Sequence, residues 1–210
     1  MHRKTSKRGT QTGAGSPRPP AEAAARSVRI IAGQWRGRRV AFQPVPGLRP
    51  TPDRVRETLF NWLQRSVVGA RCLDLYAGTG ALGFEALSRG AAESVFVERD
   101  PIAVRNLIAV AQTLGANQAR ITQSDAQVFL SGSPQPFDLV FLDPPFALGA
   151  LGELCTLLDS RGWLAPAAHI YLEQAARDAL PELPPGWRQI KETRAGEVRA
   201  LLAQRAVGGT

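Results

Sequence analysis

The chain has 210 residues, of which 44% are hydrophobic, a composition that is ordinary for one globular domain. No apolar run approaches the ~20 residues that span a membrane, and Ala21–Ala25 is too short for a secretory signal, so we expect a cytoplasmic protein without membrane contact. Cys72 and Cys155 lie far apart without metal-ligand spacing, so no metal site is expected.

Positive charge is concentrated toward the N-terminus. Residues 1–56 contain thirteen Lys and Arg and two acidic residues, whereas residues 57–210 contain thirteen and sixteen. This asymmetry predicts that one part of the molecule binds a polyanion, and a solubilising tail is the alternative. Residues 1–27 are rich in Gly, Pro, Ser and basic residues with almost no large apolar ones, which predicts a disordered basic tail.

An ordered N-terminal extension is predicted over residues 28–66. Two β-prone runs separated by a glycine-bounded turn predict a hairpin with a basic, aromatic tip. Thr51 is a candidate helix cap, Pro52 suits the first helical position, and apolar residues then recur at helical spacing. The segments are Val28–Ala32 and Arg38–Phe42 for the hairpin, and Val55, Leu59, Trp62 and Leu63 for the helix face.

Residues 67–210 alternate between strand and helix patterns, which predicts an α/β fold with a mainly parallel sheet covered on both faces. The last two strand patterns are predicted to pair antiparallel. The predicted strands are Cys72–Tyr76, Ser94–Glu98, Arg120–Thr122, Asp138–Leu142, His169–Leu172, Arg188–Lys191 and Val198–Leu202, and the helices are one ending at Ser88, Pro101–Leu114 and Leu151–Leu158.

A glycine motif follows the first strand of this domain. Its spacing, G-x-G-x-x-G, fits a nucleotide-containing cofactor, including the dinucleotides. Glu98 ends the next strand, where an acid can accept hydrogen bonds from ribose hydroxyls. Asp74 favours S-adenosylmethionine over a dinucleotide, because a carboxylate repels a pyrophosphate but attracts the ammonium and sulfonium of S-adenosylmethionine. The candidate cofactor-binding residues are Asp74, Tyr76, Gly78, Gly80, Glu98 and Asp125, the last as an acceptor for the adenine amino group or as a solvated loop acid.

A second motif, Asp143-Pro144-Pro145-Phe146, ends the apolar strand pattern 138–142. Prolines cannot continue a β-ladder, so the carbonyl groups there can face a ligand. The Asp143 carboxylate and the Pro144 carbonyl can each accept one N–H of an exocyclic amine, which favours a pyramidal nitrogen with its lone pair toward the methyl group. Phe146 can stack on the base. The motif therefore predicts methylation of an exocyclic amino group.

Together these motifs resemble those of the amino-group methyltransferases. The N-terminal sequences restrict the resemblance to one family of that group. Arg29–Gly33, Gly37–Arg39 and Arg49–Phe60 are similar to the bacterial 16S ribosomal RNA guanine-966 N2-methyltransferase family. The resemblance, from about Val28 to Leu202, implies a Rossmann-like class I methyltransferase fold with a seven-stranded sheet and a hairpin-and-helix extension.

The family resemblance also implies S-adenosylmethionine as cofactor, and one guanine of 16S rRNA, in the 30S subunit or its assembly intermediate, as substrate. Asp143–Phe146 would hold the guanine, and a monomer is expected. The expected RNA-binding residues are Arg36, Arg38, Arg39, Arg49 and Thr51.

Other functions remain open at this point. The amine chemistry also fits adenine N6 in DNA or RNA and a glutamine amide in a protein. The glycine motif permits an NAD-binding oxidoreductase, and the basic hairpin permits a non-catalytic RNA-binding protein.

Overall fold

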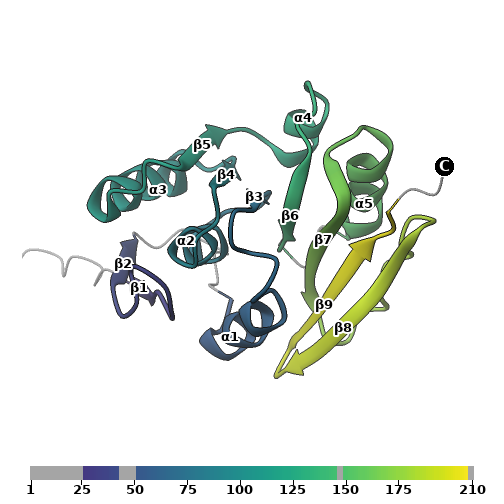
Figure 1. Ribbon diagram of the computed structural model, residues 1–210, viewed down its shortest axis with the longest axis horizontal. Coiled ribbons are helices and arrows are strands. Elements are labelled where there is room, and N and C mark those ends of the chain that lie inside the picture. Colours follow the sequence, from purple (N-terminus) through teal and green to yellow (C-terminus); the bar gives the residue numbers. More distant parts are fainter. Residues whose placement is uncertain (1–25, 43–50, 146–148, 208–210) are drawn as a thin grey trace, which may run out of the picture.

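The computed structural model describes residues 26–42, 51–145 and 149–207. Its body is a seven-stranded sheet in the order β5-β4-β3-β6-β7-β9-β8 (Figure 1). Neighbouring strands from β5 to β7 pair parallel, whereas β9 pairs antiparallel with both β7 and β8. The predicted mainly parallel sheet with an antiparallel C-terminal pair is confirmed. The strands are β3 (Arg71–Asp74), β4 (Glu93–Glu98), β5 (Ala119–Gln123), β6 (Phe137–Leu142), β7 (Leu164–Ala175), β8 (Trp187–Ala195) and β9 (Val198–Arg205).

Helices cover both faces of the sheet, which buries apolar side chains on each side. One core cluster joins side chains of α1, α2 and α3 to one sheet face, and a second joins those of α4 and α5 to the other (Figure 1). The five-residue α4 was not predicted, because one helical turn is too short to show a period. The helices are α1 (Asp53–Trp62), α2 (Ala81–Ser88), α3 (Pro101–Leu114), α4 (Ala126–Leu130) and α5 (Leu151–Ser160).

The predicted hairpin is present. Strands β1 (Arg26–Arg29) and β2 (Arg39–Phe42) pair antiparallel, and β1 begins two residues before the predicted start of order at Val28. The rest of the predicted tail, residues 1–25, lies outside the described residues. Trp35 is buried in the core rather than exposed at an aromatic tip, because the turn between the strands lies against α2.

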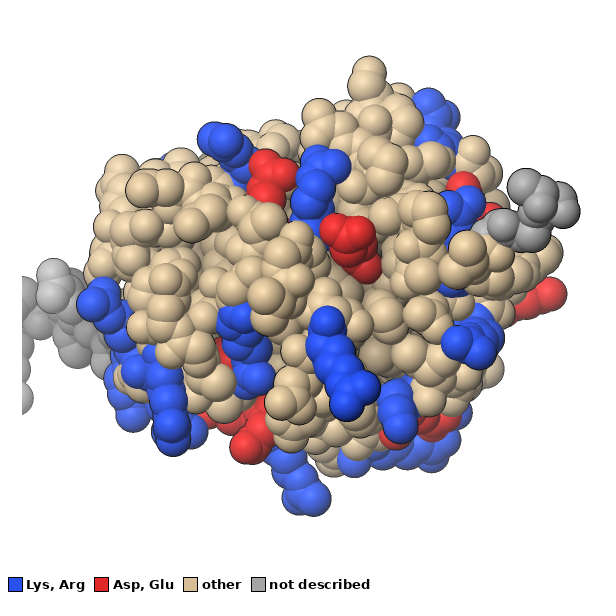
Figure 2. Space-filling view, viewed as in Figure 1, with Lys and Arg blue, Asp and Glu red and all other residues tan. Residues whose placement is uncertain are grey.

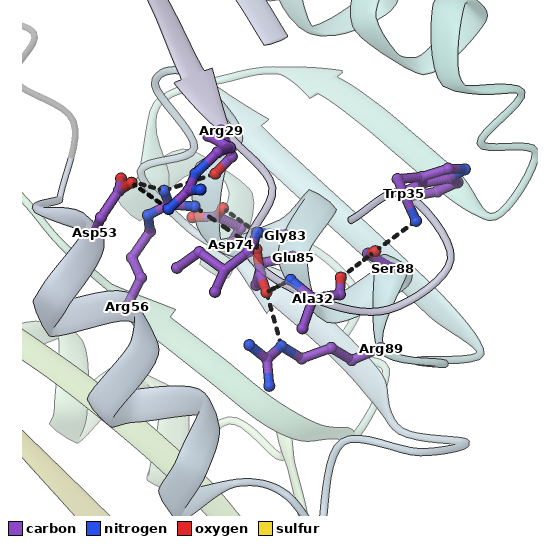
Figure 3. A network of polar contacts seen from close by, with 11 residues as sticks. Arg29, Ala32, Trp35, Asp53, Arg56, Asp74, Gly83, Glu85, Ser88 and Arg89 are labelled. Atoms are coloured by element: carbon purple, nitrogen blue, oxygen red, sulfur yellow. Dashed lines mark hydrogen bonds and ion pairs between the residues drawn. The ribbon is translucent and has the colours of Figure 1, made fainter. Parts of the chain in front are cut away.

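A buried polar network fixes the extension to α2 (Figure 3). The Glu85 carboxylate accepts hydrogen bonds from the backbone amides of Ile31 (2.7 Å) and Ala32 (3.0 Å). The Ser88 hydroxyl accepts one from the Trp35 amide (3.0 Å) and donates to the Ala32 carbonyl oxygen (2.6 Å). The hairpin turn is thereby held at two points on one helix.

Helix α1 begins differently from the prediction. Its N-cap is Pro52, without a side-chain capping hydrogen bond, so the prediction that Thr51 caps the helix was wrong. The Thr51 hydroxyl instead contacts a distant acid, described below. No helix in the described ranges is long and apolar enough to cross a bilayer.

The docking of the hairpin turn can be tested with a matched pair of glycines. Gly33 and Gly37 have φ of +83° and +80°, but only at Gly33 would a Cβ meet the Ser88 carbonyl oxygen, at 1.8 Å. Gly37→Ala should cost about 1–2 kcal/mol of unfolding free energy from backbone strain. Gly33→Ala should cost about 1–3 kcal/mol more, because backbone must move. Urea unfolding measures both, and equal losses would contradict the close approach.

Candidate functional site

The carboxyl ends of β3 and β6 form the switch point of the sheet. From β3 the chain proceeds outward to β4 and β5, and it then returns to the other side of β3 as β6. Ligands of open α/β sheets bind at such points, because the loops that follow the two strands diverge. Asp74, Glu98 and Asp143 lie at or directly after the carboxyl ends of β3, β4 and β6, so the topology brings residues from both predicted motifs to one edge.

The glycine turn packs closely on the helices that follow it. Gly80, with φ +76°, precedes α2, and a Cβ there would lie 2.6 Å from side-chain atoms of Leu107 and Phe84. Asp74 is 2% exposed, and its Oδ2 accepts a hydrogen bond from the Gly83 amide (3.0 Å; Figure 3). The acid at the end of β3 is therefore fixed to the first turn of α2.

Asp74 is a buried carboxylate without a cation among its described neighbours. Burial raises its pKa from 3.8 to about 7, the Gly83 amide opposes this shift, and the negative charge of Glu98 adds to it. A buried acid with no countercharge is electrostatically suited to a cationic ligand.

Glu98 and Asp125 both accept hydrogen bonds from backbone amides. Glu98 accepts hydrogen bonds from Gly78 (2.9 Å) and Asp100 (2.8 Å), which joins the glycine turn to the start of α3. Asp125 is exposed and caps α4 by accepting from the Gln127 amide (2.9 Å), a role that the sequence analysis did not include. Its negative charge also helps, after burial, to raise the pKa of Tyr76, so these two candidates lie near one another.

The second motif follows β6 directly. The Thr51 hydroxyl donates a hydrogen bond to Asp143 Oδ2 (3.1 Å) across 92 positions of sequence. Thr51 is only 5% exposed, which sets it inside the candidate site rather than on an open RNA-facing surface. Pro144 is buried and Pro145 exposed, while Phe146 and Arg49 fall outside the described residues.

Glu173 belongs to this site but was not predicted. In the register of β6 and β7, Leu142 pairs with Leu172, so Asp143 and Glu173 occupy adjacent positions on neighbouring parallel strands. Glu173 is 3% exposed, and its Oε2 accepts a hydrogen bond from the Tyr171 hydroxyl (2.7 Å). The sequence did contain a signal for Glu173. It directly follows the apolar strand pattern that ends at Leu172, and an acid in the continuation of such a strand is unusual.

Both acids have raised pKa values. Burial, followed by the nearby Glu173 carboxylate, raises the pKa of Asp143 well above its usual value, and the Thr51 hydrogen bond opposes this. Burial likewise raises the pKa of Glu173, while hydrogen bonds from Tyr171 and Thr51 lower it. In the described ranges, no group of three or more His, Cys, Asp or Glu is arranged to hold a metal ion.

The basic candidates of the hairpin lie on the surface. Arg36, Arg38 and Arg39 are exposed, and Arg38 Nη1 donates to the Thr113 carbonyl oxygen of α3 (3.4 Å). Figure 2 shows Lys and Arg side chains gathered at the lower left, where the hairpin lies in Figure 1. The hairpin thus presents exposed positive charge beside α2, which follows the glycine turn, and beside α3.

Comparisons with known proteins agree on one family. The family model described as conserved hypothetical protein 95 matches residues 28–204. Ribosomal RNA small subunit methyltransferase D of Escherichia coli K12 is 49% identical over 182 residues, which cover 87% of this chain and 92% of that protein.

Solved structures have the same fold. A structure described as putative methyltransferase yhhF from Escherichia coli is 47% identical and covers 87% of this chain and 99% of its own, with a TM-score of 0.80. An RNA methyltransferase from Salinibacter ruber in complex with S-adenosyl-L-homocysteine is 18% identical and has a TM-score of 0.59, with coverage of 77% and 97%. The latter similarity shows a shared fold.

The buried state of Asp74 leads to a prediction about stability. Because its pKa rises from 3.8 to about 7 on folding, the folded chain binds more protons between these values. The resulting contribution to stability is fully present below pH ~4 and is lost as pH rises through ~7, at about 1.4 kcal/mol per pKa unit.

Asp74→Asn keeps an acceptor for the Gly83 amide but cannot ionise. In urea unfolding without cofactor, the variant should gain stability relative to wild type between pH 5 and pH 8.5, by about 3 kcal/mol. The Asp74 charge also helps to raise the pKa of Asp143, so the difference measures Asp74 together with its coupling to Asp143. An identical pH dependence in both would contradict the raised pKa.

Proposed function

Because the chain belongs to the family described as conserved hypothetical protein 95 and is 49% identical to a ribosomal RNA small subunit methyltransferase D, we propose that it methylates guanine 966 of 16S ribosomal RNA at N2. The similar proteins support the general activity, which is methyl transfer to small-subunit ribosomal RNA. The chemistry of Asp143 and Pro144 supports an exocyclic amine as acceptor, and the family resemblance of residues 29–60 supports guanine N2 among such amines.

One contact carries the proposal. The hydrogen bond from Thr51 to Asp143 joins the N-terminal segment on which the resemblance depends to the acid of the Asp-Pro-Pro-Phe motif. Two sequence motifs that are 92 positions apart thereby meet in one site, as a shared role in one reaction requires.

The residues around the glycine turn fit S-adenosylmethionine as cofactor. The buried, unneutralised Asp74 suits the cationic part of that molecule. Glu98 retains lone pairs beyond its two amide contacts and would accept from ribose hydroxyls. Gly78, Gly80 and Tyr76 would line the same site, and Asp125 near Tyr76 would face the adenine. When bound, the cofactor supplies a methyl group already activated by its sulfonium.

The chain's own part in the reaction is to prepare the amine. The lone pair of a guanine amino group is delocalised into the ring, so the nitrogen is a weak nucleophile. Asp143 and the Pro144 carbonyl would each accept one N–H and hold the nitrogen pyramidal, with Pro145 fixing the turn and Phe146 stacking on the base. Thr51 orients the Asp143 carboxylate through its hydrogen bond. These interactions strengthen as the nitrogen changes shape, which lowers the barrier.

The substrate would reach the site through contacts with the basic surface. Arg36, Arg38 and Arg39, together with Arg49, would contact phosphates beside the target base, and the base would be turned out of its stack into the site. We propose that the enzyme acts as a monomer in the cytoplasm on the 30S subunit or its assembly intermediate.

The proposed function is tested by product analysis. Purified protein, methyl-labelled S-adenosylmethionine and 30S particles from a strain lacking the enzyme are incubated, and the RNA is digested to nucleosides. The label should appear in N2-methylguanosine. Label in N6-methyladenosine would overturn the base, and label in protein would overturn the RNA assignment.

The proposed mechanism predicts a graded effect at Asp143. Asp143→Ala should lower the rate constant of methyl transfer at least ~100-fold, the lower range for loss of one preorganised electrostatic group. Asp143→Asn keeps one acceptor and should lose less. Calorimetry should show similar cofactor affinity in all three proteins. Equal turnover of wild type and Asp143→Ala would contradict the role of the motif.

A further inference from the structure

The site contains one more buried acid than the proposed mechanism uses. Glu173 is 3% exposed, and no basic side chain in the described part of the chain lies within ion-pair distance of it. An uncompensated buried carboxylate is costly to the folded state. Its position beside Asp143 at the switch point, rather than elsewhere in the core, points to a ligand that supplies donors.

Glu173 has acceptor capacity to spare. A carboxylate offers about four lone-pair positions. The Tyr171 hydroxyl takes one on Oε2 (2.7 Å), and the Thr51 hydroxyl, which donates to Asp143, is close enough to affect Glu173 also. At least two positions remain for a substrate group.

The three bases with exocyclic amines differ next to the amine. Guanine carries N1–H beside the N2 amino group, so two donors point the same way. Adenine N1 and cytosine N3 carry a lone pair beside the amino group instead. A second carboxylate next to the amine-binding Asp143 therefore attracts guanine, and it repels the ring nitrogen of adenine or cytosine.

From this juxtaposition we infer that Glu173 accepts a hydrogen bond from N1–H of the target guanine and is the residue that selects guanine over adenine and cytosine. The inference rests on the proposed function and deepens it. Asp143 and Pro144 hold the reacting amine, whereas Glu173 identifies the base. The Thr51 hydroxyl donates to Asp143, and the Tyr171 hydroxyl occupies one lone pair of Glu173, which leaves at least two for the base.

The test varies the base and keeps the amine. 30S particles are reconstituted with guanine, 6-thioguanine or 2-aminopurine at the target position. 6-Thioguanine changes the C6 substituent but keeps N1–H, whereas 2-aminopurine keeps the N2 amine but has a lone pair at N1. Wild type should methylate guanine and 6-thioguanine at rates within about 5-fold, and 2-aminopurine at least ~100-fold more slowly, because a site built for a donor rejects a base that lacks it.

Two variants separate recognition from support of the fold. Glu173→Gln can present an amide N–H to the N1 lone pair, so methylation of guanine should fall about 10- to 100-fold and the preference over 2-aminopurine should shrink below ~10-fold. Tyr171→Phe disturbs the same cluster but keeps the Glu173 carboxylate, and it should retain the wild-type preference. Thermal unfolding and cofactor binding check that each variant folds.

Three outcomes would overturn the inference. Wild type could methylate 2-aminopurine within ~3-fold of guanine. Glu173→Gln could lose activity on both bases equally, which would leave Glu173 a supporting role. Tyr171→Phe could lose the preference as Glu173→Gln does, which would make the effect structural. If a variant fails to fold, the rates of the wild-type protein on guanine, 6-thioguanine and 2-aminopurine still test the inference. Label in another base of unaltered particles would instead overturn the proposed function itself.

Discussion

Glu85 is fully buried on α2, and its two carboxylate oxygens accept the amides of Ile31 and Ala32 while Arg89 Nε lies 2.7 Å away. Arg56 of α1, also fully buried, lies 3.7 Å from the same carboxylate and donates to the Arg29 carbonyl oxygen (2.8 Å). One charge therefore holds both the hairpin and α1 against the sheet domain. Removal of one partner of such a buried pair costs about 3–5 kcal/mol, so the extension depends on it.

This attachment sets the geometry of the site. Thr51 lies two residues before α1, so the docking of α1 determines whether its hydroxyl reaches Asp143. The first turn of the same α2 is tied to Asp74 through the Gly83 amide. The helix thus links the acid proposed to meet the cofactor with the segment that completes the base-binding side. Burial of Asp74 and Glu173 lowers stability, as is common where a protein reserves charge for a ligand.

Most of the fold could be predicted from local pattern. Strand and helix periods gave the order of the elements, and the Asp74 and Glu98 positions followed from strand ends beside a glycine motif. The failures have separate causes. Thr51 has the chemistry of a helix cap, but Pro52 occupies the N-cap position of α1, and the Thr51 hydroxyl donates to Asp143. Trp35 looked like an exposed tip residue, but the turn that carries it lies on α2. Asp125 caps α4, an element too short to be seen in sequence.

The sequence by itself determined the class of fold, the family and the chemical types in the two motifs, because these depend on residue identity and short-range spacing. Which residues share a site was decided only by the tertiary structure. The register of β6 and β7 sets Glu173 beside Asp143, and the docking of α1 brings Thr51 to the same carboxylate. Neither contact could be predicted from a periodic pattern in the sequence, because each depends on how strands and helices that are distant in the chain pack together.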